Sequence, residues 1–338
     1  MSHARLKDIA KKAKVSIATA SLALSGKGRI SEEVRSRVRD TAEMLGYKAR
    51  RSSRAPAAAS AGLGILHAED RQYEWHFIRP TILELERSMR QRGHVTVLIP
   101  ASTRADSEKV VRHVVDSGVG AVFALQISDG AVFAALRALG IQVVVINNSG
   151  FQARFHTVCV DDFQGAYEGA LFLLSQGHRS LAFVEYERPE SPNVVADRFI
   201  GFRKALEQHR IAFSPERRIT VPFMDAKKLQ KRLAVLFRRS ERPTAIFAHD
   251  DYLGLFIIDA LRTLGLSVPE DVSLVAPGDV LDYSLPLMPQ ITTMRIDTTL
   301  LGRIAANIMF DRMRNADSDV HVLKVKEQLV RRGSCRQM

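Results

Sequence analysis

The sequence predicts a small all-α module at the N-terminus, followed by a larger α/β core with parallel sheets. Three observations lead to this fold class. The chain has 338 residues, of which 46% are hydrophobic, and that is too long for one ordinary core, so two or three domains are expected. The first sixty residues show the spacing of short helices and an excess of positive charge. From Leu63 onward, short apolar runs alternate with amphipathic stretches, which is typical of strands alternating with helices.

Positive charge is concentrated at the N-terminus. The net charge is +12, and residues 1–60 hold 14 Lys and Arg against 5 Asp and Glu, a net of +9. The remaining residues hold 35 against 32, a net of +3. A solvated basic face would explain a single charged run, but a whole small module with this bias favours binding to a polyanion. Nucleic acid is the first candidate partner, and an acidic membrane surface is the second.

Composition also limits which cellular compartment and which metal or disulfide sites are expected. The sequence contains no apolar run long enough to span a bilayer, and its N-terminus lacks the basic-then-apolar pattern of a secretory signal. A cytoplasmic protein is therefore expected. The two cysteines, Cys159 and Cys335, lack the partner spacing of a metal site, and two cysteines are too few for a disulfide framework. We expect neither a metal nor a cofactor.

The first two helices follow from apolar spacing and one capping residue. Leu6, Ile9, Ala10 and Ala13 recur at i, i+3, i+4 and i+7, which places them on one face of a helix. Ser16 is a good N-cap for a second helix over residues 17–24. The residues that this second helix can bury are Ala20, Ala23 and Leu24.

A third helix is predicted after Ser31, which can cap it. Val34, Val38 and Leu45 supply its apolar stripe. Three short helices with a three-residue turn between the first two match a helix-turn-helix unit. A generic three-helix bundle with basic decoration is the alternative. The small residues that allow the first two helices to approach closely, together with the charge bias, favour the DNA-binding interpretation.

The segment "LKDIAKKAKVSIATASLALSG", followed by "ISEEVRSRVRDTAEMLGY", resembles the headpiece of the LacI family of bacterial transcription regulators. That family shows L-x-D-[IV]-A, V-S-x-x-T-[VA]-S and R-x-[RK]-V-x-x-x-A-x-x-L-G-Y at these spacings. The resemblance implies that residues 1–47 bind double-stranded operator DNA. The DNA-binding residues that we expect, including those of the linker that follows, are Lys7, Ser16, Ile17, Ala18, Thr19, Ser21, Leu22, Ser25, Lys27, Arg29, Arg50, Arg51 and Arg54.

The second helix departs from the usual chemistry of base reading. In the family this task falls largely to outward residues of that helix, here Ile17, Ala18 and Leu22. Their side chains offer only apolar contacts, for example with a thymine methyl group. Most of the polar residues around them are expected to contact phosphates, which position the helix without specifying a sequence.

The linker, residues 48–60, departs from the family as well. The family carries P-N-x-x-A-x-x-L there, a segment that forms a hinge helix on DNA and wedges its Leu into the minor groove. Here Pro56 stands where the wedge Leu is expected, and Pro removes a backbone donor inside a helix. A full hinge helix is therefore not expected. The arginines of the linker suit phosphates or a narrow minor groove, and a plain solvated linker is the alternative.

Residues 61–338 are predicted to form the α/β core. The strand candidates are "LGILHA", "HVTVLIP", "AVFALQI", "QVVVINN", "SLAFVEY", "TAIFAHD" and "VSLVAPG". The helix-like spans lie near 77–92, 105–117, 130–139, 162–176, 195–209, 226–239 and 251–264. This alternation implies parallel sheets with helices on both faces, and ligands of such sheets bind at the carboxyl ends of the strands.

The core also resembles the effector-binding core of the LacI family, which is similar to the periplasmic sugar-binding proteins. The segments that carry the resemblance are "VDDFQGAYEGALFLLSQGHRSLAFV", "RFIGFRKAL", "RPTAIFAHDDYLGLFIIDALRTLGLSVPEDVSLVAPGD" and "EQLVRRGSC". The resemblance implies two doubly wound parallel-sheet subdomains between which the chain crosses three times. The first is expected at about 61–160 plus a return near 291–320, and the second at about 163–290.

Site candidates follow from the same motifs. Arg198 stands at the family's R-x-x-G-F arginine, which reaches into the cleft, and a guanidinium suits hydroxyls, a carboxylate or a phosphate. A surface salt bridge is the alternative for Arg198. His249 and Asp250 stand where the family has Asn/Asp-Asp, and Asp279 stands at the family's Asp-Asp, with Gly278 replacing the first Asp.

Further candidates lie at other strand ends. Tyr73, Trp75 and Phe77 follow the first strand, and an aromatic ring there can stack on a sugar face or a base. Packing at the start of the next helix is the alternative for these three residues. Asp129 and Asn148 end other predicted strands. The resemblance therefore implies a small-molecule effector, with a carbohydrate as the first choice.

These observations favour a DNA-binding transcription regulator, a repressor, that acts as a homodimer on the nucleoid under the control of an effector. An enzyme would use His249, Asp250 and Asp251 as acid and base groups, but the sequence offers no activated nucleophile, phosphate loop or metal spacing, so no catalytic residue is expected. A transport-type solute-binding protein would share the core, but it would need a signal segment and would not carry the basic module.

Overall fold

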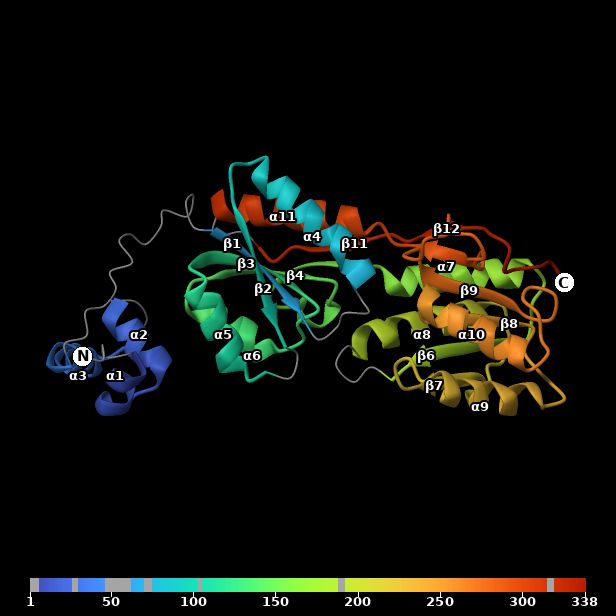
Figure 1. Cartoon of the computed structure of the whole chain (residues 1–338), viewed down its shortest axis with the longest axis horizontal. Helices are drawn as coiled ribbons and strands as arrows, with labels where there is room; N and C mark the ends of the chain where they lie inside the picture. The colour runs from blue at the N-terminus through green and yellow to red at the C-terminus, as the bar shows by residue number, and fades with distance from the viewer. Residues whose placement is uncertain are drawn as a thin grey trace. The chain divides into compact units, whose positions relative to one another are not determined.

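The computed structural model describes residues 6–25, 30–45, 62–69, 75–102, 105–187, 192–314 and 319–338 (Figure 1). The chain divides into two compact units, Met1–Ala61 and Gly62–Met338. Each unit contains its own cluster of buried apolar side chains, as expected of a separate domain. The linker expected at residues 48–60 lies outside the described residues. The prediction about its hinge helix falls on the same residues.

The first unit consists of three helices in its described part. They are α1 (Leu6–Ala13), α2 (Ile17–Ser25) and α3 (Glu32–Met44). The Ser16 side chain accepts a hydrogen bond from the backbone N–H of Thr19 at 3.0 Å, which is the N-cap that the sequence predicts. The core of the unit is formed by Ile9, Ala10, Ala13, Ala20, Ala23, Val38 and Ala42. Because four of these seven residues are alanines from α1 and α2, the two helices can pack closely.

The first sheet of the core has six strands in the order β11-β5-β4-β3-β1-β2, and each neighbouring pair is parallel. Helices α4 and α11 cover one face, and α5 and α6 cover the other. The elements of this subdomain are β1 (Gly62–Ala68), α4 (Trp75–Arg90), β2 (Thr96–Ala101), α5 (Ser107–Asp116), β3 (Val119–Leu125), α6 (Gly130–Ala138), β4 (Gln142–Ile146), η2 (Ser149–Phe151), β5 (His156–Val160), α11 (Thr298–Arg314) and β11 (Val322–Val325).

The second sheet has the order β12-β10-β9-β8-β6-β7. Its pairs are parallel except for β10 with β12. Helices α9 and α10 cover one face, and α7 and α8 cover the other. The elements are α7 (Asp162–Ser175), β6 (Leu181–Tyr186), α8 (Pro192–Gln208), η3 (Pro215–Arg217), β7 (Arg218–Val221), α9 (Ala226–Phe237), β8 (Ala245–Ala248), α10 (Asp251–Thr263), β9 (Ser273–Gly278), β10 (Thr292–Arg295) and β12 (Gln328–Val330). Both sheets are doubly wound, as predicted.

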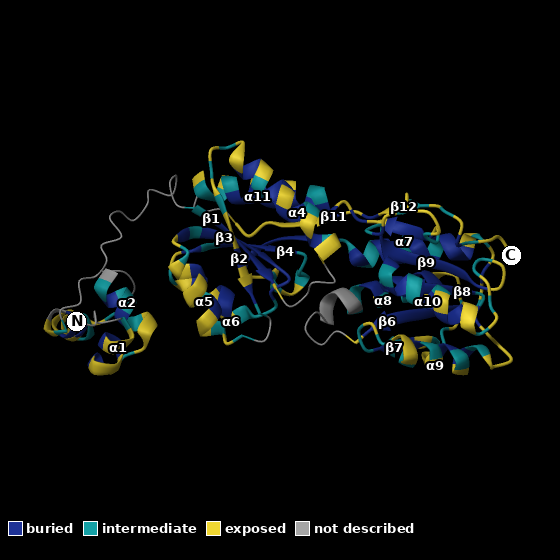
Figure 2. Ribbon diagram, viewed as in Figure 1, coloured by how far each residue is buried: buried dark blue, intermediate teal, exposed yellow. Residues whose placement is uncertain are grey.

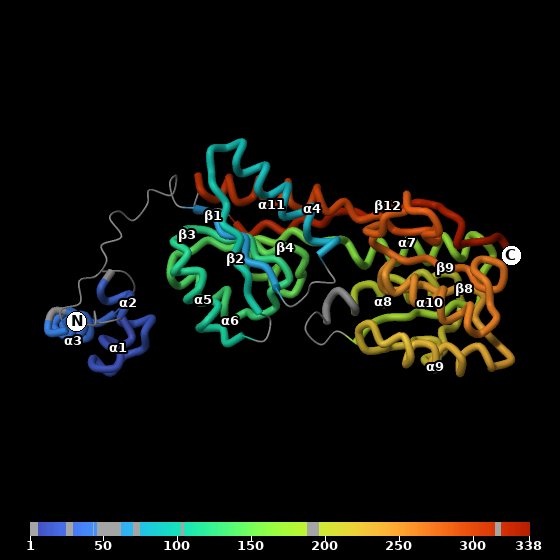
Figure 3. The backbone as a smooth tube through the Cα atoms, viewed as in Figure 1, coloured from blue at the N-terminus to red at the C-terminus, as the bar shows by residue number. Residues whose placement is uncertain are grey.

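The central strands of both sheets are buried between their helix layers (Figure 2). The chain crosses between the subdomains after β5, after β10 and after β11, and Figure 3 traces these crossings. The return to the first subdomain was expected near residues 291–320. The structure instead places Thr292–Arg295 in the second sheet, because β10 pairs with β9, and the return begins with α11. The chain then goes back to the second sheet at β12.

Candidate functional site

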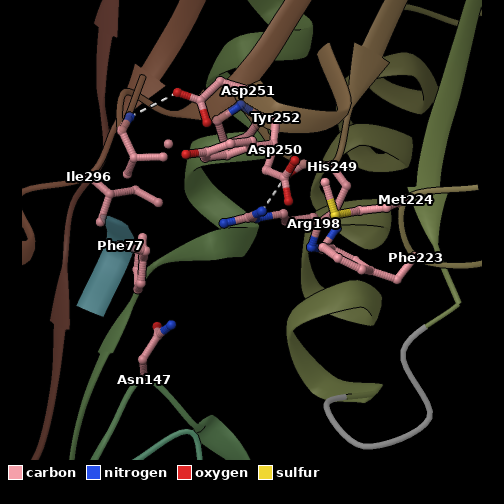
Figure 4. Close-up of a pocket in the computed structure, with 13 residues that line it drawn as sticks. Phe77, Asn147, Arg198, Phe223, Met224, His249, Asp250, Asp251, Tyr252 and Ile296 are labelled. Atoms are coloured by element: carbon pink, nitrogen blue, oxygen red, sulfur yellow. Dashed lines mark hydrogen bonds between the residues drawn. The ribbon is translucent and has the colours of Figure 1, made fainter. Parts of the chain in front are cut away.

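A cavity of about 100 Å³ lies at the carboxyl ends of the strands, where both subdomains of the core contribute side chains. Figure 4 shows Phe77, Asn147 and Ile296 on one side and Phe223, Met224 and His249 on the other. The first group belongs to the α4–β4 region and to the crossing after β10, whereas the second belongs to the second subdomain. The remaining residues that line this cavity are Arg198, Asp250, Asp251, Tyr252, Pro277, Gly278 and Val280. We call it the cleft cavity.

Arg198 lies at the wall of the cleft cavity, in the middle of α8, and is only 6% exposed. Its Nε donates a hydrogen bond to Asp162 Oδ1 at 2.8 Å, and its Nη1 donates to the backbone carbonyl of His249. Burial alone lowers the pKa of Arg198, but Asp162, Glu327 and Asp250 outweigh it and raise the pKa above its usual value. The arginine is therefore charged, and two of its three nitrogens already bind protein acceptors.

Glu327 is a functional-site neighbour that the sequence analysis missed. It lies in the crossing between β11 and β12, is 1% exposed, and neither carboxyl oxygen has a hydrogen-bond partner among the described residues. It packs against α7 at Gly165, where a Cβ atom would come within 2.3 Å of the Glu327 Cδ. Burial raises the pKa of Glu327 well above its usual value, with Arg198 opposing and Asp162 adding to the rise. The folded protein therefore holds the Glu327 proton up to a higher pH than the unfolded chain does.

Asp250 and Asp251 begin α10, directly after β8. Asp250 is the N-cap and accepts from the N–H of Leu253 at 2.7 Å. Asp251 is completely buried, and its Oδ2 accepts from the N–H groups of Val280 and Leu281 at 2.8 and 3.3 Å. Asp251 Oδ1 has no partner among the described residues. Burial, followed by the charge of Asp250, raises the pKa of Asp251 to about 7.

The backbone conformation and the close neighbours of position 278 explain why glycine stands there in place of the family's first Asp. Gly278 has φ +128°, and a Cβ atom there would lie 2.8 Å from Asp251 Oδ1. Any side chain would therefore be strained and would also contact that oxygen. The loss of a carboxylate at position 278 leaves Asp251 as the buried acid at this end of the cleft cavity.

Of the aromatic candidates, Phe77 lines the cleft cavity, together with Phe223 and Tyr252, which the sequence analysis did not name as site residues. Trp75 is 39% exposed and packs against His67, with 6.1 Å between ring centroids. It is not among the lining residues. Tyr73 lies outside the described residues.

Three other candidates do not line the cleft cavity. Asp279 forms ion pairs with Arg295 and Arg332. Asp129 caps α6 by accepting from the N–H of Ala131 at 2.8 Å. Asn148 caps η2 through the N–H of Gly150 at 3.1 Å, and its neighbour Asn147, which has a positive φ of 58°, lines the cavity instead.

The candidate DNA-binding surface is described in part. Lys7, Ile17 and Ala18 are exposed, which leaves an apolar first turn of α2 open to a partner. Ser16 is also exposed, but its side chain caps α2. The half-buried candidates are Thr19, Ser21 and Leu22. The side chain of Ser25 and the whole of Lys27, Arg29, Arg50, Arg51 and Arg54 lie outside the described residues.

Two further features bear on function. In the described ranges of the chain, no group of His, Cys, Asp or Glu is arranged to hold a metal ion. Among the same residues, no helix is both long and apolar enough to cross a membrane.

Comparison with known proteins covers both units. The family model of bacterial regulatory proteins of the lacI family matches residues 5–49, and the model of a periplasmic binding protein-like domain matches residues 170–335. The HTH-type transcriptional repressor PurR of Klebsiella pneumoniae is 26% identical over 342 residues, which cover 98% of this chain and 96% of that protein. The same-named repressor of Escherichia coli is 25% identical with equal coverage.

Solved structures share the fold. A transcriptional regulator CelR in complex with cellobiose gives a TM-score of 0.70 at 22% identity and covers 98% of this chain and 100% of its own. The lac repressor dimer bound to operator and the anti-inducer ONPF gives a TM-score of 0.70 at 20% identity, with 99% and 100% covered. A regulator from Enterococcus faecium with bound ribose gives 0.66 at 23% identity, with 81% and 99% covered.

Proposed function

The chain belongs to the LacI family of bacterial regulatory proteins, and we propose that this DNA-binding transcription regulator is a repressor that acts as a cytoplasmic homodimer on the nucleoid. The relatives that are named repressors support this function, and a dimer is how the lac repressor is described. Two headpieces in a dimer match a pseudo-palindromic operator, because each half-site takes one recognition helix. No catalytic role is proposed for any residue.

The recognition helix is α2. Its exposed Ile17 and Ala18 would enter the major groove and read thymine methyl groups by apolar contact. Lys7, which is exposed on α1, would contact a phosphate and position the headpiece. The arginines of the linker would add phosphate contacts and so strengthen binding without adding sequence preference.

The core would bind a small polar effector in the cleft cavity, and a carbohydrate is our first choice. The observation that carries this proposal is Asp251, a buried carboxyl group that lines the cavity and has one oxygen without a partner among the described residues. Such an oxygen is stabilised by a ligand hydroxyl or N–H that donates to it. Phe77, Phe223 and Tyr252 supply rings for the less polar face of the same ligand.

Control would follow from the position of the cavity between two subdomains that are joined by three crossings. A ligand that contacts Phe77 in one subdomain and Asp251 in the other would favour one arrangement of the two. Such coupling amounts to the difference in affinity of the ligand for the two arrangements. The effector would change operator affinity by at most the ratio of its own affinities for the two arrangements.

A calorimetric screen of the full chain tests the effector class. The titrants would be neutral monosaccharides and disaccharides, sugar acids and nucleobases, with operator affinity measured in parallel at fixed salt. The proposal expects a neutral sugar to bind and to change operator affinity. If only a nucleobase binds, the effector is a planar ring compound and the proposed carbohydrate is wrong. If only sugar acids bind, the proposed role of the Asp251 carboxyl group is wrong.

A further inference from the structure

We propose that the core contains a second ligand site, for a small phosphorylated polyol, at the amino ends of β4 and β5. A cavity of about 360 Å³ lies there, within the size range of small-molecule sites. Its walls come from the end of α6, the starts of β4 and β5, and the end of α11. We call it the basal cavity.

The basal cavity and the cleft cavity lie at opposite ends of one strand. Gln142 begins β4 and lines the basal cavity, whereas Asn147 directly follows β4 and lines the cleft cavity. A strand of this length rises about 16 Å, so one ligand of small size cannot occupy both cavities. The basal cavity is therefore distinct from the proposed effector site, and the inference does not depend on that site.

The charge of the basal cavity points to an anion. Arg137, Arg154 and Arg312 line it, and none of its described lining residues is an Asp or Glu. Within the described part of the chain, Arg137 and Arg154 form no ion pair, and the only polar link between them is a long contact of 3.5 Å from Arg137 to the Arg154 carbonyl. The guanidinium of Arg137 lies over the ring of Phe155 at 5.2 Å, which holds it at the cavity wall. Guanidinium groups at the wall of one cavity suit a phosphate group.

His156 adds a neutral donor to this wall. It is buried and lines the basal cavity. Its Nδ1 accepts a hydrogen bond from the N–H of His321 at 3.1 Å, so the ring proton is on Nε2. Burial first, and then the positive charges of Arg312 and His321, lower the pKa of His156 to about 4. The imidazole is therefore neutral at physiological pH.

Gln142 indicates that the anion also carries a hydroxyl group. Its Nε2 donates to the carbonyl oxygen of Arg312 at 3.4 Å, which fixes the orientation of the amide. Its Oε1 is buried and has no partner among the described residues. A ligand hydroxyl that donates to Oε1 would satisfy this acceptor. The apolar side chains of Ile141, Val143 and Met309 complete the wall and suit the carbon skeleton of a polyol.

A nucleic-acid backbone is the other phosphate ligand to consider. Its phosphates are read by exposed basic surfaces that follow the duplex, whereas Arg137 and Arg154, although exposed, line a cavity together with the buried His156. The enclosed acceptor of Gln142 also needs a donor, and phosphodiester oxygens only accept. A small hydroxylated phosphate fits both groups better than DNA does.

The test is a calorimetric titration of the full chain with glycerol 3-phosphate, with glycerol and inorganic phosphate as matched probes. Glycerol 3-phosphate should bind at one site per chain and more tightly than either matched probe. Gln142→Glu, which adds a negative charge to the cavity that would hold the ligand phosphate, and Arg137→Ala, which removes an exposed guanidinium, should each weaken that binding at least tenfold. Arg232→Ala removes an exposed arginine of α9 in the other subdomain and should leave it unchanged.

Several results would overturn the proposal. One is the absence of glycerol 3-phosphate binding to the unaltered chain while its melting curve is normal. Another is binding that survives Gln142→Glu and Arg137→Ala but is lost on Asp251→Asn, which would place the ligand in the cleft cavity. A third is competition by short duplex DNA together with weaker DNA binding of Arg137→Ala, which would assign the arginines to the nucleic-acid backbone.

Discussion

Arg198 of α8 and Asp162 of α7 form an ion pair that is almost completely removed from solvent, with 2.8 Å between Nε and Oδ1 and side-chain exposures of 7% and 6%. The same guanidinium binds the carbonyl of His249 at the end of β8. One arginine therefore joins α7, α8 and the β8–α10 turn next to the cleft cavity. This position gives Arg198 a structural role whatever the cavity binds.

Replacing Arg198 by methionine should destabilise the core by about 3–5 kcal/mol, because it leaves the charge of Asp162 buried without its partner. Urea denaturation of the full chain, monitored for the core transition, measures this loss. The control is Lys204→Met, which removes a cation from an exposed position of the same helix and should change stability by less than about 0.5 kcal/mol. Equal stability of the two variants would show that the ion pair contributes nothing.

Glu327→Gln should change the pH dependence of stability. Burial raises the pKa of Glu327 well above its usual value, so the folded chain keeps a proton that the unfolded chain releases above about pH 4.5. Stability of the unaltered chain therefore falls as pH rises above that value, and glutamine removes this contribution. Relative to the unaltered chain, the variant should gain stability between pH 5 and pH 8. A stability difference that is constant over this range would contradict the raised pKa of Glu327.

Asp251→Asn should weaken effector binding roughly tenfold or more, because it replaces a charge-assisted hydrogen bond worth about 1.5–3 kcal/mol. Since the pKa of Asp251 is raised to about 7, the carboxylate is the stronger acceptor above that pH, and effector affinity of the unaltered chain should rise between pH 6 and pH 8. Calorimetry at both values measures the effect. Asp259→Asn, on the exposed side of α10, is the control. An affinity of the Asp251 variant equal to that of the control would place Asp251 outside the ligand contact.

The long helices could be predicted from the sequence, but some of the short strands could not. The predicted spans near 226–239 and 251–264 are α9 (Ala226–Phe237) and α10 (Asp251–Thr263) in the structure, because each has a sustained apolar face. The short strands β10 (Thr292–Arg295) and β12 (Gln328–Val330) gave no apolar pattern of their own, whereas β4 and β8, which are also short, are apolar and were predicted. The pairing of β10 and β12 depends on partners far away in the sequence.

The site was predictable where a side chain ends a central strand. His249 and Asp250 follow β8 and reach the cleft cavity. Asp129 and Asn148 also end strands, but short polar side chains at such positions readily cap the following turn, and both do so. Glu327 could not have been found from local sequence, because its burial comes from α7 and from the space left by Gly165.

The decisive measurement is the salt dependence of duplex DNA binding by the full chain and by Ala18→Asp. Ala18 is exposed in the first turn of α2, where an acidic residue is compatible with the helix but repels the DNA backbone. Ala134→Asp, at an exposed position of α6 in the core, is the matched control. The unaltered chain should show log K falling linearly with log salt, by about 0.9 for each phosphate neutralised. Ala18→Asp should weaken binding at least tenfold at every salt concentration, and Ala134→Asp should leave it unchanged. If Ala18→Asp binds operator DNA as tightly as the unaltered chain, α2 is not the DNA-binding surface and the proposed function is wrong.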